Sequence, residues 1–171
     1  MSVIEFEFKD IKRIAANKTR IEKKYGVKLL IYRNKVVIQP LKQDESAWFA
    51  EQAIQAIAFG FPFQVASLIG TDIIFKEISL KDLTTRKSRL RTIKSRILGR
   101  EGRARKILER LSSCRLLIKN NEIGIIGEPE EVALLSHALE KLVRGSSHGS
   151  VYSFMERERK KLKARRLIET Y

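Results

Sequence analysis

The chain has 171 residues, of which 43% are hydrophobic and 32% charged, and its formal net charge at pH 7 is +15. This composition is that of a globular protein rather than a disordered or fibrous one. No apolar run approaches the roughly 18 residues of a membrane span, and the first residues lack the basic and apolar regions of a secretory signal. A single cysteine, Cys114, excludes an internal disulfide, so we expect a reducing, cytoplasmic compartment. The excess of positive charge favours a polyanionic partner, nucleic acid before an anionic membrane surface.

The first part of the chain predicts a small sheet with helices. Phe6-Glu-Phe alternates as a half-buried strand does, and residues 18–25 are typical of a helix. Residues 27–32 and 36–39 predict two strands, and the Arg-Asn pair between them predicts a two-residue turn because Asn tolerates positive φ. Asp44 is a candidate N-cap for a helix whose apolar positions have helical spacing: Ala47, Ala50, Ile54 and Ile57.

The chain then repeats this pattern. Residues 26–31 resemble residues 113–118, and the match runs on from Asn34 to Asn121 at the same offset of 87. Residues 53–57 also match 138–142, Gly60 matches Gly145, and residues 6–11 match 78–83. We therefore predict an α+β fold of two tandem units, residues 1–70 and 71–147. Each has the order β-α-α-β-β-α and a three-stranded sheet with helices on one face.

The second copy predicts the corresponding elements in chain order. They are a strand at 78–80, helices at 86–98 and 103–111, strands at 114–119 and 122–126, an Asn120-Asn121 turn, and a helix with Pro129 in its first turn. Residues 152–167 predict a last helix within a basic C-terminal segment, residues 148–171. Its expected apolar positions are Val151, Phe154, Leu162 and Leu167.

Positive charge is concentrated in two segments. Residues 86–110 carry a net charge of +9, and residues 156–171 carry a net charge of +4. The density of the first cluster favours a binding patch over a solvated face. The second cluster is as typical of a solvated tail as of a binding surface.

A loop with two glycines, Gly99-Arg100-Glu101-Gly102, lies within the first cluster and joins two predicted helices. Glycine lets a backbone approach a phosphodiester because no Cβ intrudes, and the free N–H groups of the following helix favour an anion. We therefore predict a phosphate clamp; the alternative is a plain tight turn. The predicted binding residues are the loop, nearby cations and three apolar side chains that would line a groove for bases: Gly99, Arg100, Glu101, Gly102, Arg103, Arg105, Lys106, Lys94, Arg96, Ile93, Ile97 and Leu116.

The aligned positions of the first copy, residues 12–15, hold Lys-Arg-Ile-Ala and no glycine pair. The first copy also lacks the preceding helix. We interpret it as a degenerate unit that supports packing or partner binding, without a phosphate clamp of its own.

The residues of an enzyme site are missing. The only histidines, His137 and His148, and the lone cysteine have no zinc-site spacing, and no phosphate-binding GxxxxGK[ST] loop is present. Cys114 begins a predicted strand, which is typical of a buried filler residue. We therefore expect no catalytic residues, no metal and no cofactor.

The loop resembles that of a type I KH domain, in which a GxxG loop clamps about four nucleotides of single-stranded RNA. Longer stretches resemble the archaeal two-KH ribosome-assembly family, the counterpart of the eukaryotic partner of the Nob endonuclease. They are Phe59-Gly-Phe-Pro-Phe63, residues 78–83, residues 89–105, residues 124–127 and His148-Gly149-Ser150-Val-Tyr152. One departure is that the first unit is unusually short before Lys18.

The resemblance implies a non-enzymatic factor that holds single-stranded pre-rRNA near the 3′ end of 16S rRNA and assists its processing. It also implies two protein partners, a Nob-type endonuclease and the alpha subunit of translation initiation factor 2. For His148, Gly149, Ser150 and Tyr152 it favours a contact with RNA or partner over a turn with a buried tyrosine. The alternatives are a general mRNA-binding or exosome-accessory KH protein, and a docking protein for translation or nuclease factors.

Overall fold

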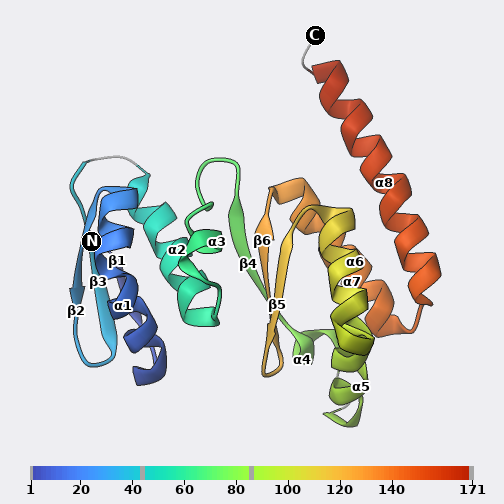
Figure 1. Cartoon of the computed structure of the whole chain (residues 1–171), viewed down its shortest axis with the longest axis horizontal. Coiled ribbons are helices and arrows are strands. Elements are labelled where there is room, and N and C mark those ends of the chain that lie inside the picture. The colour runs from blue at the N-terminus through green and yellow to red at the C-terminus, as the bar shows by residue number, and fades with distance from the viewer. Residues whose placement is uncertain (1, 43–44, 85–86, 170–171) are drawn as a thin grey trace. The chain divides into compact units, whose positions relative to one another are not determined.

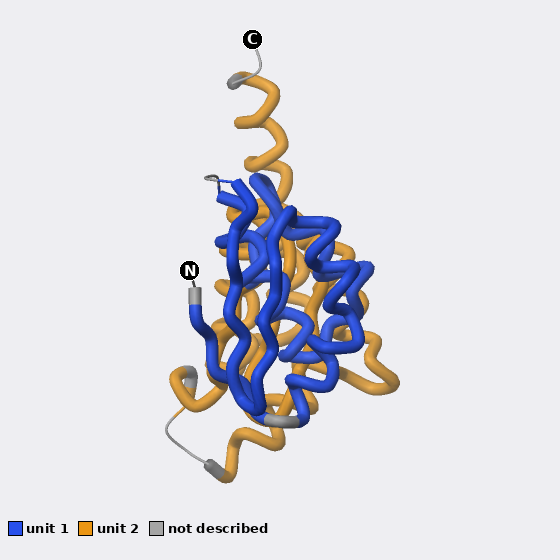
Figure 2. Tube along the Cα trace, turned by 90° about the vertical axis from the view of Figure 1, so that its left-hand side faces the viewer, with its two compact units in different colours: residues 1–75 blue, residues 76–171 orange. Residues whose placement is uncertain are grey.

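The computed structural model describes residues 2–42, 45–84 and 87–169. The chain divides into two compact units, residues 1–75 and 76–171 (Figure 2). The C-terminal helix, expected as a segment of its own, belongs to the second compact unit. The predicted N-cap, Asp44, and the first residue of the basic cluster, Arg86, lie outside the described residues.

The first unit is a three-stranded antiparallel sheet in the order β1-β3-β2, with helices on one face (Figure 1). Its elements are β1 (Ser2–Glu5), α1 (Phe8–Tyr25), β2 (Val27–Ile31), β3 (Lys35–Pro40), α2 (Ser46–Phe59) and the short α3 (Phe63–Ala66). The strand predicted at Phe6-Glu-Phe is wrong, because β1 ends at Glu5 and Phe8 already begins α1. Helix α1 continues to Tyr25 because Ile11, Ile14 and Ile21 bury one helical face.

The second unit repeats this sheet in the order β4-β6-β5 and adds helices before and after it. Its elements are β4 (Ile74–Ser79), α4 (Leu80–Leu83), α5 (Lys87–Leu98), the 3₁₀ turn η1 (Arg100–Gly102), α6 (Arg103–Ser112), β5 (Arg115–Lys119), β6 (Glu122–Gly127), α7 (Pro129–Arg144) and α8 (His148–Glu169). Where the first unit has the single helix α1, the second therefore has α4, α5 and α6, and the extra residues carry the GxxG loop.

The internal repeat is visible in matching contacts. The Glu22 carboxylate accepts a hydrogen bond from the Leu29 N–H at 2.8 Å, and 87 residues later Glu109 accepts one from Leu116 at the same distance. The turn residues Asn34 and Asn121 each accept, on their carbonyl oxygens, a backbone N–H bond of 2.7 Å from the segment at the end of β1 or β4. The sequence match thus corresponds to one fold used twice.

Helix α8 packs along α6 and α7 on the side away from the sheet (Figure 1). Val151 and Met155 of α8 are fully buried, and the Lys141 Nζ of α7 lies 4.8 Å from the ring centre of Phe154 in α8. Leu167, one of the expected apolar positions of this helix, is 66% exposed and so does not belong to its buried face. Within the described ranges, no helix is both long and apolar enough to cross a membrane.

Candidate nucleic-acid interface

The GxxG loop is a tight turn built from left-handed backbone. Gly99, Glu101 and Gly102 have φ values of 70°, 53° and 73°. The Gly102 N–H bonds back to the Gly99 carbonyl at 3.2 Å, which closes the turn between α5 and α6. Residues with a side chain seldom adopt this backbone conformation. The two glycines and the exposed Glu101 therefore define a sharp corner at the surface.

The two glycines have different roles. A Cβ on Gly99 would lie 2.6 Å from the Cβ of Ala104 and 2.7 Å from its nitrogen, so glycine is required where α5 meets α6. A Cβ on Gly102 would meet nothing within 4 Å. Gly102 is therefore the position where the loop backbone is open to a ligand, while Gly99 permits the close helix contact that shapes the loop.

The start of α6 has an unbalanced positive electrostatic field. Its N-cap, Gly102, has no side chain to bond the free N–H groups, and no acidic residue lies in its first turn. The side chains of Arg100, Arg103 and Lys106 are exposed around it. An ion pair between Arg103 and Glu101 at 3.3 Å joins two side chains that are each more than 70% exposed, so it contributes little to stability in water.

Three other cations of the predicted site are half-buried, and two of them join separate segments of the unit. Lys94 donates to the Asn120 carbonyl at 3.1 Å and to the Asn121 side chain at 3.3 Å, which fastens α5 to the β5–β6 turn. Arg105 lies 3.8 Å from Glu109 on α6. Arg96 donates to the Ser146 carbonyl in the segment before α8. Lys94 and Arg96 therefore position neighbouring segments, while the Arg105 pair lies within one helix.

The prediction that Ile93, Ile97 and Leu116 face bases is wrong. Their side chains are 3%, 0% and 2% exposed, so they form the hydrophobic core beneath the loop. The helical spacing of Ile93 and Ile97 places them on the same face, and that face packs inward. Two other apolar side chains of α5 and β5, Leu90 and Ile118, are partly exposed.

Sequence reasoning missed a contact between the start of α8 and the end of α5. His148 donates from Nε2 to the Arg96 carbonyl at 2.8 Å, and its ring lies 6.0 Å from that of Tyr152. Arg96 is in the last turn of α5, directly before the GxxG loop. Arg96 therefore accepts a hydrogen bond from His148 on its carbonyl and donates one from its side chain to Ser146. These two bonds fix the segment that leads into the loop.

We expect His148→Ala to loosen the GxxG loop without unfolding the unit, because it removes one hydrogen bond worth about 1 kcal/mol. Hydrogen exchange at the Gly102 amide, measured without RNA, should become several-fold faster, and RNA affinity should fall several-fold. His137→Ala, a change at an exposed position on α7, is the matched control. Unchanged exchange at Gly102 in His148→Ala would show that the hydrogen bond from His148 to Arg96 does not order the loop.

Cys114 and the first unit offer less for a binding site than the GxxG loop does. Burial raises the pKa of the Cys114 thiol to about 12, so it remains a neutral, buried side chain. In the part of the chain that the structure describes, no cluster of His, Cys, Asp and Glu is arranged to hold a metal ion. In the first unit, α1 runs unbroken through residues 12–15, so those positions form no glycine turn.

Comparison with known proteins identifies the family. The family model for the second KH domain of PNO1, a eukaryotic-type KH domain (KH-domain type I), matches residues 74–160, about half of the chain. The chain belongs to this family. A KH domain-containing protein of Methanocaldococcus jannaschii is 34% identical over 154 residues, which cover 87% of this chain and 68% of that protein. This agrees with the archaeal two-KH resemblance seen in the sequence.

Two further relatives carry functional names. The pre-rRNA-processing protein pno1 of Emericella nidulans is 25% identical over 119 residues, which cover 67% of this chain and 46% of that protein. The chain thus spans about half the length of this fungal PNO1-type relative. A matching chain in the crystal structure of the a/eIF2alpha–aDim2p–rRNA complex from Pyrococcus horikoshii OT3 is 30% identical, with a TM-score of 0.83 and coverage of 94% of both chains.

Proposed function

We propose that this PNO1-type KH protein binds single-stranded RNA through the GxxG face of its second unit. The observation that carries the proposal is the open corner at Glu101-Gly102, which leads directly into the uncapped start of α6. Exposed Arg100, Arg103 and Lys106 surround that corner. Backbone N–H groups, the helix dipole and three cations together suit the phosphates of an extended strand.

The RNA is, in this proposal, small-subunit pre-rRNA near the 3′ end of 16S rRNA. Support comes from the fungal relative named as a pre-rRNA-processing protein and from the archaeal complex that contains rRNA. The protein acts by holding the strand in a defined path and so assists its processing. The bond cleavage itself belongs to a partner enzyme.

The proposed protein partners are the alpha subunit of translation initiation factor 2 and a Nob-type endonuclease. The first is supported by the a/eIF2alpha chain in the Pyrococcus complex, and the second by the family resemblance of the sequence. Because the first unit lacks a glycine turn, we assign protein docking to it and RNA binding to the second unit.

Crosslinking in cells, followed by mapping of the bound RNA, tests the proposed substrate. We expect reads to cluster near the 3′ end of small-subunit rRNA and to disappear in a variant with a disabled GxxG loop. Reads spread over mRNAs would contradict the rRNA assignment and favour a general mRNA-binding or exosome-accessory protein.

A further inference from the structure

We propose that the bound RNA continues beyond the GxxG loop to a second phosphate-binding site at the far end of α6, where α8 completes the site. This inference rests on the proposed function, because the same RNA strand is extended. It makes the C-terminal helix part of the RNA-binding surface and predicts a longer footprint than the loop alone would give.

A stripe of cations leads from the loop to this site. Arg103, Lys106 and Arg110 are three and four residues apart on α6, so they share one face and span about 10 Å at 1.5 Å per residue. All three are exposed, and they lie opposite the buried face of the helix, which carries Ala104, Leu108 and Leu111. A strand leaving the clamp thus meets positive charge along the whole of α6.

The stripe ends in a groove of about 420 Å³ between the last turn of α6 and the start of β5. Its lining combines three cations with one carboxylate and two small side chains: Lys106, Arg110, Arg115, Glu109, Ser113 and Cys114. Among the residues that the structure describes, Lys106, Arg110 and Arg115 take part in no ion pair. The Glu109 carboxylate, which also lines the groove, accepts the Leu116 N–H at 2.8 Å and lies 3.8 Å from Arg105.

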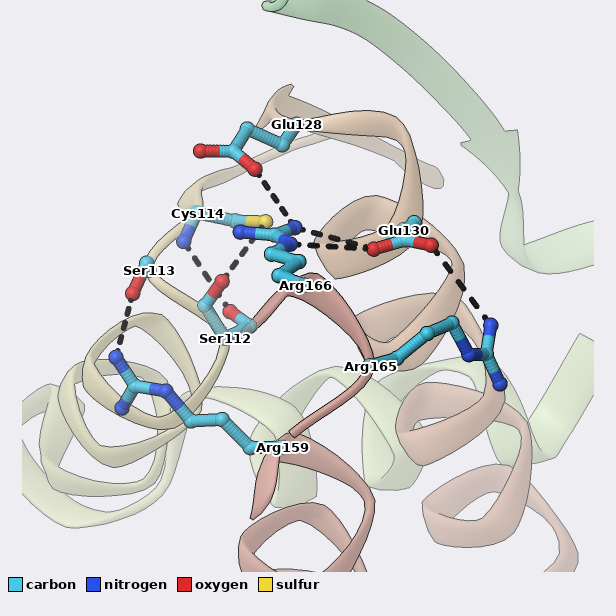
Figure 3. A network of polar contacts seen from close by, with 8 residues as sticks. All are labelled: Ser112, Ser113, Cys114, Glu128, Glu130, Arg159, Arg165 and Arg166. Atoms are coloured by element: carbon cyan, nitrogen blue, oxygen red, sulfur yellow. Dashed lines mark hydrogen bonds and ion pairs between the residues drawn. The ribbon is translucent and has the colours of Figure 1, made fainter. Parts of the chain in front are cut away.

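Helix α8 adds a fourth, fixed cation beside this groove. Arg159 donates to the Arg110 carbonyl at 3.0 Å. It also donates to the Ser113 hydroxyl at 2.8 Å (Figure 3). Both acceptors are neutral, so these bonds position the guanidinium without forming an ion pair. Hydrogen-bonded guanidinium and hydroxyl groups at the mouth of a cationic groove suit a phosphate oxygen.

A second set of contacts keeps α8 in place. Arg166 lies 2.7 Å from Glu128 and 3.2 Å from Glu130, and Arg165 lies 3.9 Å from Glu130 (Figure 3). These pairs use carboxylates at the start of α7, so they fasten the C-terminal part of α8 to that helix. The basic C-terminal helix therefore divides into an anchoring part around Arg166 and a part around Arg159 that serves the groove.

The test compares short and long single-stranded RNA on the full chain. Fluorescence anisotropy is measured with labelled RNA of about four nucleotides, the span of a GxxG clamp, and with RNA about twice that length. The variant is Arg110→Gln with Arg115→Gln, which spares the Arg110 carbonyl that Arg159 uses. We expect the wild-type protein to bind the longer RNA at least tenfold more tightly, and the variant to bind the short RNA normally but lose most of this gain. Its dependence of log K on log salt should flatten by about 1.4, because single strands release roughly 0.7 counterion per contact.

Arg157→Gln with Lys160→Gln removes two exposed charges of α8 and is the matched control, which should bind both RNAs as the wild type does. A variant that retains the gain with length, or that loses short and long RNA equally, overturns the second site while the proposed function stands. A wild-type protein that binds neither RNA overturns the proposed function and this inference together.

Discussion

Replacing Arg100 and Glu101 together by Asp is expected to lower single-stranded RNA affinity about a hundredfold while leaving the fold intact. Each charge-assisted hydrogen bond lost costs about 1.5–3 kcal/mol, and tenfold in affinity corresponds to about 1.4 kcal/mol. The new carboxylate at position 100 would also repel the phosphate that the Arg100 guanidinium attracts. The loop should keep its shape, because Asp tolerates the left-handed backbone at residue 101, whose φ is 53°.

Anisotropy with labelled RNA measures this loss, and circular dichroism checks the fold. Arg13→Asp is the matched control, since it changes the net charge equally at the aligned, exposed part of the first unit. It should bind RNA almost as the wild type does. Equal losses in the two variants would mean that the overall charge, rather than the GxxG corner, governs binding.

Gly99→Ala is expected to destabilise the second unit by about 2–3 kcal/mol and to disable RNA binding with it. Gly99 has φ 70° and ψ 174°, a region that is almost restricted to glycine and costs other residues about 1–3 kcal/mol. The added methyl would also stand 2.7 Å from the Ala104 nitrogen, so the start of α6 must move. Thermal or denaturant unfolding measures the loss.

Gly149→Ala is the control for this prediction. Gly149 lies in the first turn of α8, and a Cβ there meets nothing within 4 Å. Alanine should be neutral or stabilise the helix by up to about 1 kcal/mol. If Gly99→Ala unfolded at the same temperature as the wild type, the close contact between α5 and α6 would not constrain the loop.

Local signals in the sequence predicted the repeated sheet and the loop. Asn120-Asn121 forms the expected two-residue turn, Pro129 begins α7, and the Gly60–Gly145 match marks the end of the last KH helix in each copy, α2 and α7. These features depend on residues that are neighbours in the sequence, so the sequence alone predicts them. The start of α1 at Phe8 was not predicted, because Phe6-Glu-Phe alternates between apolar and polar residues as a strand does. The apolar face of an 18-residue helix outweighs so short an alternation.

The functional surface was harder to predict, because it depends on contacts between distant residues. Helical spacing correctly grouped Ile93 with Ile97 but does not say whether their face meets the sheet or a ligand. The bonds of Lys94 to the β5–β6 turn and of His148 to Arg96 join residues 26 and 52 positions apart, respectively. Through such pairings, residues that were expected to bind RNA instead make structural hydrogen bonds. No local sequence pattern predicts these pairings.

Amide chemical shifts, recorded while the protein is titrated with single-stranded RNA of the 16S 3′-terminal sequence, identify the residues that the RNA contacts. We expect the largest shifts at Gly99 through Lys106, followed by Arg110 and Arg115, and no shifts of similar size at residues 12–15 of the first unit. Shifts confined to the first unit, or no shifts at the Glu101-Gly102 corner at saturating RNA, would contradict RNA binding by the GxxG loop.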